Sequence, residues 1–169
     1  ADRGIGCERC HGPGGNHLAA ARTGFSELAI ARPRLARPAE VVTLCAGCHT
    51  SPASMDADDP KAVRFQAPTF VRSRCYVESN EGFSCVVCHD PHRDAERSPA
   101  FYEAKCRDCH RAGGSGGPSD RPAAAVCRVD AAKGCLGCHM PRVENAVPRT
   151  VFTDHHIRVR RGAGGEVKP

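Results

Sequence analysis

The sequence has few of the side chains that usually build a protein core. Only 5% of its 169 residues are aromatic, tryptophan is absent, and there are two tyrosines and six phenylalanines. Glycine, with 17 residues, and proline, with 13, are plentiful instead. A composition so poor in large apolar side chains is typical of disordered chains. A folded structure would therefore need a core that is supplied by something other than side chains.

Long apolar segments are also missing. No stretch approaches the roughly 18 residues that a membrane-spanning helix needs. No basic start leads into an apolar segment of the kind found in secretion signals. We therefore expect a soluble chain without a membrane span.

Cysteine, in contrast, is abundant, with twelve residues. Ten of them form five copies of the motif Cys-x-x-Cys-His, at Cys7, Cys10 and His11, at Cys45, Cys48 and His49, at Cys85, Cys88 and His89, at Cys106, Cys109 and His110, and at Cys135, Cys138 and His139. The copies are unevenly spaced, so they are separate sites and not the units of a solenoid. In this motif the two thiols form thioethers with the vinyl groups of a haem, and the histidine becomes the proximal ligand of the iron. The sequence therefore predicts five c-type haems.

Other uses of paired cysteines fit the pattern less well. Zinc sites contain Cys-x-x-Cys pairs, but they do not need a histidine directly after each second cysteine. A disulfide framework does not need this histidine either, and a thioredoxin-like site requires a βαβ pattern that is missing. Cys75 and Cys127 lie outside the motifs. We predict that these two form a disulfide in an oxidising compartment, with two free buried thiols as the alternative.

Haem irons also take distal ligands, and four histidines remain outside the motifs: His17, His92, His155 and His156. We predict that all four are distal ligands, because each lies close to a motif or in a tight local pattern. The rigid Asp90-Pro91 step should aim His92 at a haem other than that of its own motif. His155 and His156 are neighbours whose side chains diverge, so they would serve different haems.

The fifth iron has no histidine left for its distal side. Four alternatives stay open: methionine ligation, a vacant site, a weak ligand, or a histidine from another chain. Met55 is the better methionine, because Met140 directly follows a proximal histidine and is badly placed to reach round its own ring. A thioether ligand would raise the potential of that haem. A vacant iron would bind small ligands and permit catalysis.

Local signals predict short helices between and within the motifs. Residues 17–31 are rich in alanine and carry apolar side chains at helical intervals. Residues 38–48 and 99–109 each begin with a proline, which is favoured in the first turn of a helix. Residues 111–120 are predicted to form a flexible loop, and residues 162–169 a flexible C-terminal tail. No segment reads as a strand.

These patterns predict a mostly α fold with much irregular coil and no substantial sheet. Its short helices and loops would wrap around a stacked core of five haems. We expect one pentahaem cytochrome c domain over residues 1–161, followed by the tail.

Four segments near the motifs resemble the cytochrome c554-like multihaem family. Residues 6–14 (GCERCHGPG), followed by His17, look like the CExCHGPG…H block of that family, and residues 88–92 look like its CHDPH block. Residues 138–142 and 152–155 match its CHMP and DH segments. The resemblance covers most of the chain. It implies a multihaem core and distal ligand roles for His17, His92 and His155.

The chain departs from the family at two places. Relatives often carry a basic residue after the histidine that matches His155, whereas this chain has His156. They also often carry further haems upstream of the motif that begins at Cys7. The resemblance therefore leaves the role of His156 open, and it implies that a partner or a further segment supplies part of the usual assembly.

Together the motifs predict electron transfer along closely packed, mostly bis-histidine haems, since 169 residues are too few to insulate five cofactors. One alternative is a subunit of an extracellular cytochrome filament or larger redox complex, in which a neighbouring chain donates a ligand. The other is a reductase of nitrite or hydroxylamine type at a vacant iron. Enzymatic activity is the less favoured prediction, because no separate constellation of proton donors stands out.

The charge of the polypeptide does not point to nucleic acid once the haems are counted. The chain alone carries +5, with arginine-rich patches at residues 32–37 and 158–161. Five haems would add ten propionates and bring the total to about −5. We expect redox partner proteins, other multihaem chains or copies of the same chain as partners, and a location in the periplasm or at the cell surface.

Overall fold

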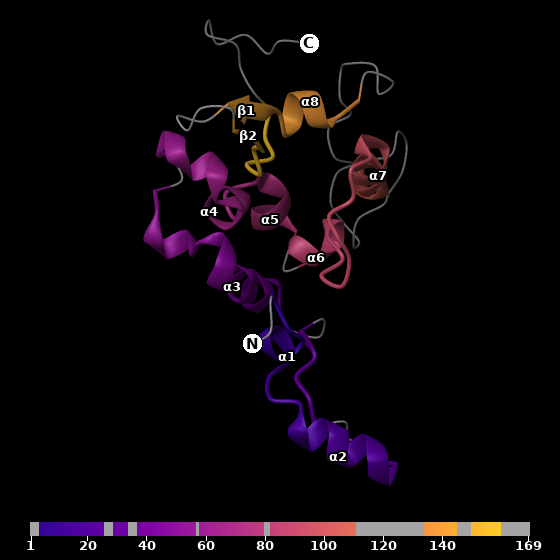
Figure 1. Ribbon diagram of the computed structural model, residues 1–169. Coiled ribbons are helices and arrows are strands. Elements are labelled where there is room, and N and C mark those ends of the chain that lie inside the picture. The colour runs from indigo at the N-terminus through magenta and orange to yellow at the C-terminus, as the bar shows by residue number, and fades with distance from the viewer. Residues whose placement is uncertain are drawn as a thin grey trace, which may run out of the picture.

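The computed structural model describes residues 4–25, 29–33, 37–56, 58–79, 82–110, 134–144 and 150–159. Within these ranges the protein is mostly helical, with much irregular coil and one small two-stranded sheet (Figure 1). The predicted mostly α fold without a substantial sheet is thus confirmed. The predicted loop at 111–120 and the tail at 162–169 lie outside the described residues, and the domain limits stay a prediction.

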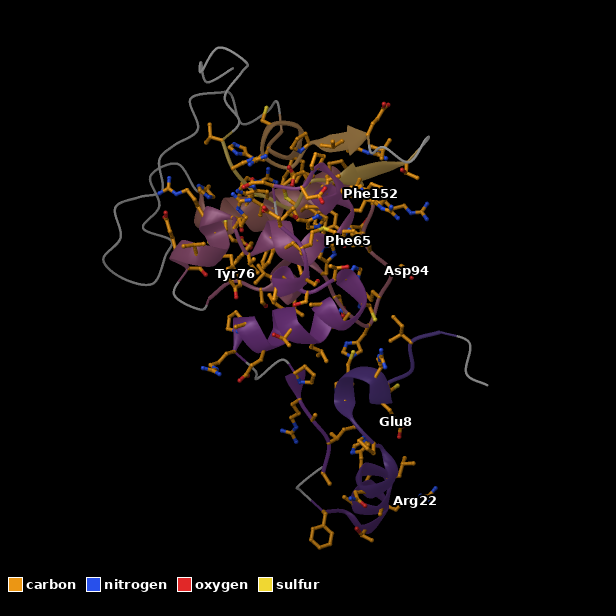
Figure 2. The ribbon with its side chains drawn as sticks, turned by 90° about the vertical axis from the view of Figure 1, so that its left-hand side faces the viewer. Glu8, Arg22, Phe65, Tyr76, Asp94 and Phe152 are labelled. Atoms are coloured by element: carbon orange, nitrogen blue, oxygen red, sulfur yellow. The ribbon has the colours of Figure 1, made fainter. Side chains whose placement is uncertain are left out.

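Two N-terminal helices extend away from the rest of the structure as an arm, as both views show (Figures 1 and 2). They are α1 (Glu8–His11) and α2 (Gly15–Thr23). The turn between them is closed by the Glu8 carboxylate, which accepts a hydrogen bond from the backbone N–H of Gly14 at 2.6 Å. The first motif therefore belongs to the arm.

The helix predicted for residues 17–31 is shorter than expected. It ends at Thr23, because Gly24 adopts a left-handed conformation with φ of 73° and breaks the helical path. The N–H of Phe25 then turns back to the carbonyl of Ala20 at 3.0 Å, which closes the end of the helix. Residues 26–28 lie outside the described ranges.

The two helices predicted from proline start signals are confirmed. Helix α3 (Pro38–His49) begins where the Arg37 N–H donates to the Glu40 carboxylate at 2.9 Å. Helix α7 (Pro99–Cys109) follows Ser98, which is extended. In each case proline occupies a position whose N–H would have no partner inside the helix, so it starts the helix without losing a hydrogen bond.

The remaining helices are single turns or little more: η2 (Pro52–Ser54), η3 (Pro60–Arg64), α4 (Gln66–Phe70), α5 (Arg74–Glu78), α6 (Cys85–Cys88) and α8 (Leu136–His139). Helices α1, α3, α6, α7 and α8 each contain most or all of one Cys-x-x-Cys-His motif. Because residues three apart lie on the same face of a helix, each motif can present both of its thiols to one side.

The sheet is a short antiparallel hairpin of β1 (Arg142–Glu144) and β2 (Val151–Thr153). Its central pair is Val143 with Phe152. Just after β2, the N–H of Asp154 donates to the Pro141 carbonyl at 3.0 Å. The hairpin therefore fixes residues 154–158 beside the last motif.

The apolar core of the described residues is small and lies around α4. Phe70 and Ala67 of α4 pack on Val42 of α3. The Phe70 ring lies 5.4 Å from both the Tyr76 and the Phe83 rings, measured between ring centres. This cluster joins α3, α4, α5 and the segment that leads into α6. No helix in the described ranges is long and apolar enough to cross a membrane.

Gly134, directly before α8, offers a test of this fold. Its φ is 80°, and a Cβ at this position would lie 2.7 Å from the Glu103 carboxylate, which accepts the Cys135 N–H at 2.8 Å. We expect Gly134→Ala to lower the free energy of unfolding by about 1–2 kcal/mol. In the control Gly15→Ala the added Cβ meets nothing within 4 Å, so stability should be unchanged or slightly raised. Thermal unfolding measures both, and equal melting temperatures would contradict this account.

Candidate functional site

None of the thiols in the described part of the chain is deeply buried. All eleven cysteines in the described residues are exposed or half-buried. Cysteine is ordinarily one of the most deeply buried residue types. The arrangement therefore presents the sulfur atoms where a covalent group can attach.

Helices that carry motifs pack against one another in series. Helix α3 contacts α6, α6 contacts α7, and α7 contacts α8. The thiols of Cys45 in α3 and Cys85 in α6 interact, and this lowers the pKa of the Cys45 thiol to about 6 and raises the pKa of the Cys85 thiol. Groups attached to the second and third motifs would therefore be close neighbours.

Three of the motif histidines have Nδ1 beside an oxygen atom. For His11 this is the Ala31 carbonyl at 2.8 Å, and for His139 it is the Arg158 carbonyl at 3.1 Å. For His49 it is the side-chain oxygen of Gln66 at 2.9 Å. A carbonyl oxygen can only accept, so Nδ1 carries the proton and Nε2 keeps its lone pair. A histidine that binds a metal through Nε2 needs this tautomer.

Two of the predicted distal histidines lie opposite motif histidines. The His92 and His11 rings have centres 5.9 Å apart and nearly parallel planes, at 15°. The His155 and His89 rings have centres 6.3 Å apart and planes at 31°. An imidazole nitrogen binds a transition metal at about 2 Å and lies about 1 Å from its ring centre, so two imidazoles on one iron hold their centres about 6 Å apart. Both pairs have the spacing of axial ligands, so these residues fit a haem iron.

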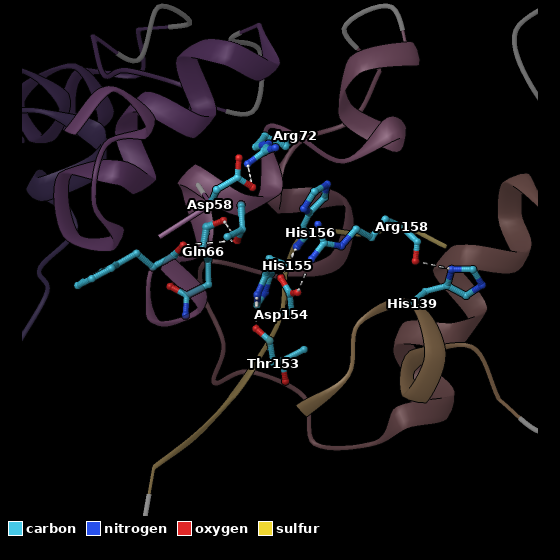
Figure 3. Close-up of polar contacts among 11 residues, drawn as sticks. Asp58, Gln66, Arg72, His139, Thr153, Asp154, His155, His156 and Arg158 are labelled. Atoms are coloured by element: carbon cyan, nitrogen blue, oxygen red, sulfur yellow. Dashed lines mark hydrogen bonds and ion pairs between the residues drawn. The ribbon is translucent and has the colours of Figure 1, made fainter. Parts of the chain in front are cut away.

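His155 is held in the orientation of a ligand. Its Nδ1 donates to the Thr153 carbonyl at 2.9 Å, which leaves Nε2 available (Figure 3). Burial lowers the pKa of His155, and burial also lowers the pKa of His89, so both imidazoles favour the neutral form that binds metals. The position of His155 depends on the hairpin, because the accepting carbonyl belongs to the last residue of β2.

His156 points in a different direction from His155, as expected for neighbouring residues (Figure 3). It lines a cleft of about 210 Å³ with Asp58, Asp154 and Arg158 among its neighbours. Its backbone N–H donates to the Asp154 carboxylate at 2.8 Å. The structure thus places it in polar surroundings, and its predicted ligand role stays a prediction.

The other predicted residues lie at separate places in the fold. His17 is half-buried on α2, and His110 is exposed at the end of α7. Met55 is half-buried after η2. Cys75 is half-buried on α5, and burial raises the pKa of its thiol. Its predicted partner Cys127 lies outside the described residues, so the disulfide stays a prediction.

A second cleft, of about 430 Å³, lies between the arm and α3. Cys10 of the first motif lines it together with Val41 and Leu44 of α3. Arg32 lies at the same cleft and belongs to one of the arginine-rich patches. A thiol, apolar walls and a cation are the features that suit a flat apolar ring with anionic propionates.

Sequence reasoning missed the groups that orient the histidines. Gln66 and the carbonyls of Ala31, Thr153 and Arg158 all meet a histidine ring. Backbone carbonyls carry no signal in a sequence. Gln66 is the only glutamine of the chain, but nothing local connects it with His49.

No group of three or more His, Cys, Asp and Glu side chains in the described part of the chain is arranged to hold a free metal ion. A haem iron takes at most two ligands from the protein, and the paired histidines have this arrangement. The chain matches no protein-family model, no curated protein and no solved structure.

Proposed function

We propose that this chain is a pentahaem c-type cytochrome that transfers single electrons. The observation that carries the proposal is the pairing of His11 with His92 and of His89 with His155, at the spacing of two axial ligands. In both pairs one member directly follows a Cys-x-x-Cys unit and the other lies outside the motifs. This is the arrangement that bis-histidine ligation of a c-type haem requires.

The residues of each site have separate roles in this proposal. The ten motif thiols hold the haems covalently, and the five motif histidines are proximal ligands. His92 and His155 are distal ligands of the first and third motifs. The haem iron supplies a reversible one-electron change of oxidation state, and the protein sets its potential through ligands, burial and hydrogen bonds.

Closeness of the sites supports electron transfer over other uses of haem. Helices α3 and α6 are in contact, and the interaction between the Cys45 and Cys85 thiols places the second and third motifs side by side. Burial is the main cause of the lowered pKa of His89 and of His155, and the nearby imidazole of His49 contributes to both, so these rings lie near one another. Cofactors bound at neighbouring sites would exchange electrons rapidly because the transfer distance is short.

We further propose that the protein works in the periplasm or at the cell surface with redox partner proteins. Covalent haem attachment of this type takes place outside the cytoplasm. Arg32 at the cleft beside Cys10 is suited to pair with a haem propionate. Such pairing gives the arginine-rich patch a role other than binding nucleic acid.

Intact mass measurement under denaturing conditions tests the cofactor content. We expect the mass of the chain plus five haems, because thioethers survive denaturation. The double variant Cys45→Ala/Cys48→Ala should lose one haem, whereas Cys75→Ala should keep all five. A wild-type chain without covalent haem would refute the proposal.

Low-temperature EPR of the oxidised protein tests the ligand pairs. We expect His92→Ala and His155→Ala each to convert one low-spin iron to a high-spin iron, because each removes one axial nitrogen. Arg93→Ala is the control beside His92, since this exposed residue pairs with Asp90 at 3.4 Å and should leave every iron unchanged. Unaltered spectra of both histidine variants would contradict the assignment.

The same spectrum of the wild-type protein separates electron transfer from catalysis. If every iron is low-spin and cyanide has no effect, all distal positions are filled. The iron for which this chain has no histidine would then be bound by Met55 or by a histidine of another chain. A high-spin iron that responds to cyanide would instead indicate an open site and a reductase.

A further inference from the structure

His49 differs from His11 and His139 in the group that accepts its Nδ1 proton. Its acceptor is the side-chain oxygen of Gln66, at 2.9 Å, whereas the other two histidines meet backbone carbonyls. A backbone carbonyl is present whatever the side chain. The acceptor for His49, in contrast, depends on which side chain occupies position 66.

The orientation of the Gln66 amide is fixed by a second hydrogen bond. Its NH₂ group donates to the Arg64 carbonyl at 3.3 Å, so the oxygen must face His49. In a flipped amide the NH₂ group would face His49 and the oxygen would face the Arg64 carbonyl. Two oxygens that can only accept cannot form a hydrogen bond with each other. The pair of contacts therefore defines Nδ1 of His49 as a donor.

The helix that begins at Gln66 is fixed in place by buried residues. Gln66 is the first residue of α4, and the four residues that follow, 67–70, are all buried. The Gln66 carbonyl accepts the Thr69 hydroxyl at 3.1 Å, and Phe70 anchors the helix in the apolar core. Since α4 packs directly on α3, which ends at His49, the two side chains are presented to each other by rigid elements.

We propose that Gln66 is a positioning residue that fixes the tautomer of His49 and sets the potential of the haem attached at Cys45 and Cys48. This inference rests on the proposed function. A hydrogen bond from Nδ1 makes the imidazole a stronger electron donor to the iron and so favours the oxidised state. A stronger acceptor lowers the potential of that one haem, and loss of the acceptor raises it.

Two substitutions at this position move the potential in opposite directions. In Gln66→Glu a carboxylate replaces the amide oxygen and accepts the Nδ1 proton more strongly, so the potential falls. In Gln66→Met a side chain of similar length has only a weak acceptor, so the potential rises. Lys61→Gln is the matched control, because this exposed residue of η3 gives the same change of net charge as Gln66→Glu.

Potentiometric titration of the whole haem-loaded protein, followed by optical and EPR spectra, is the measurement. We expect one of the five transitions to shift downward in Gln66→Glu and upward in Gln66→Met, with the EPR signal of the same iron altered. Lys61→Gln should shift no single transition as strongly as Gln66→Glu. Equal shifts in Gln66→Glu and Lys61→Gln, or the same direction in both Gln66 variants, would overturn the role of the hydrogen bond.

The haem content of each variant separates the two ways in which the idea can fail. Five haems with unchanged potentials refute the role of Gln66 and leave the cytochrome proposal intact. A wild-type chain without covalent haem refutes both. A third outcome is that Gln66→Met loses one haem, whereas Gln66→Glu keeps all five and one of its potentials falls. This outcome supports the role of the hydrogen-bond acceptor at position 66 in positioning His49.

Discussion

Packing of Phe70 is the interaction on which the arrangement of the sites depends. Its ring joins Val42 of α3 to Tyr76 and Phe83, and Ala46 and Cys85 border the same cluster. Ala46 lies inside the second motif and Cys85 begins the third. One apolar contact thus brings two motifs side by side, and it also holds α4 where Gln66 meets His49. A smaller side chain at position 70 would weaken all of these relationships at once, because the chain has few other large apolar residues to replace it.

So small an apolar core explains why the fold would depend on bound haems for its stability. In the described residues the buried apolar side chains are Val41, Val42, Ala62, Ala67, Pro68 and Phe70. Hydrophobic burial is the main favourable term in folding, and so few side chains contribute little of it. Cysteines ordinarily add to a core, but those in the described residues are exposed or half-buried. Haems attached at these thiols would cover them with large apolar rings, so cofactor binding and folding would be one process.

Local parts of this structure could be predicted from the sequence, and long-range parts could not. The starts of α3 and α7 follow from Pro38 and Pro99, because proline acts on its own backbone. The end of α2 at Gly24 was missed, although glycine is a common helix end, since the apolar periodicity continues to Ala31. The motifs predict which residues would carry the chemistry, because each motif is local in the sequence. Which histidines face each other depends on the packing of α3, α6 and the hairpin, and no local pattern records that packing.

The two histidine pairs show why axial ligation would do more than set potentials. His11 belongs to the arm, and its partner His92 lies in the segment after the third motif. His89 of that motif in turn meets His155, which follows the hairpin near the end of the described chain. An iron bound between each pair would therefore tie the arm to the body and the C-terminal segment to the third motif. These are the long-range links that a small side-chain core does not provide. In the proposed cytochrome, the ligands that tune electron transfer are also the contacts that hold distant segments together.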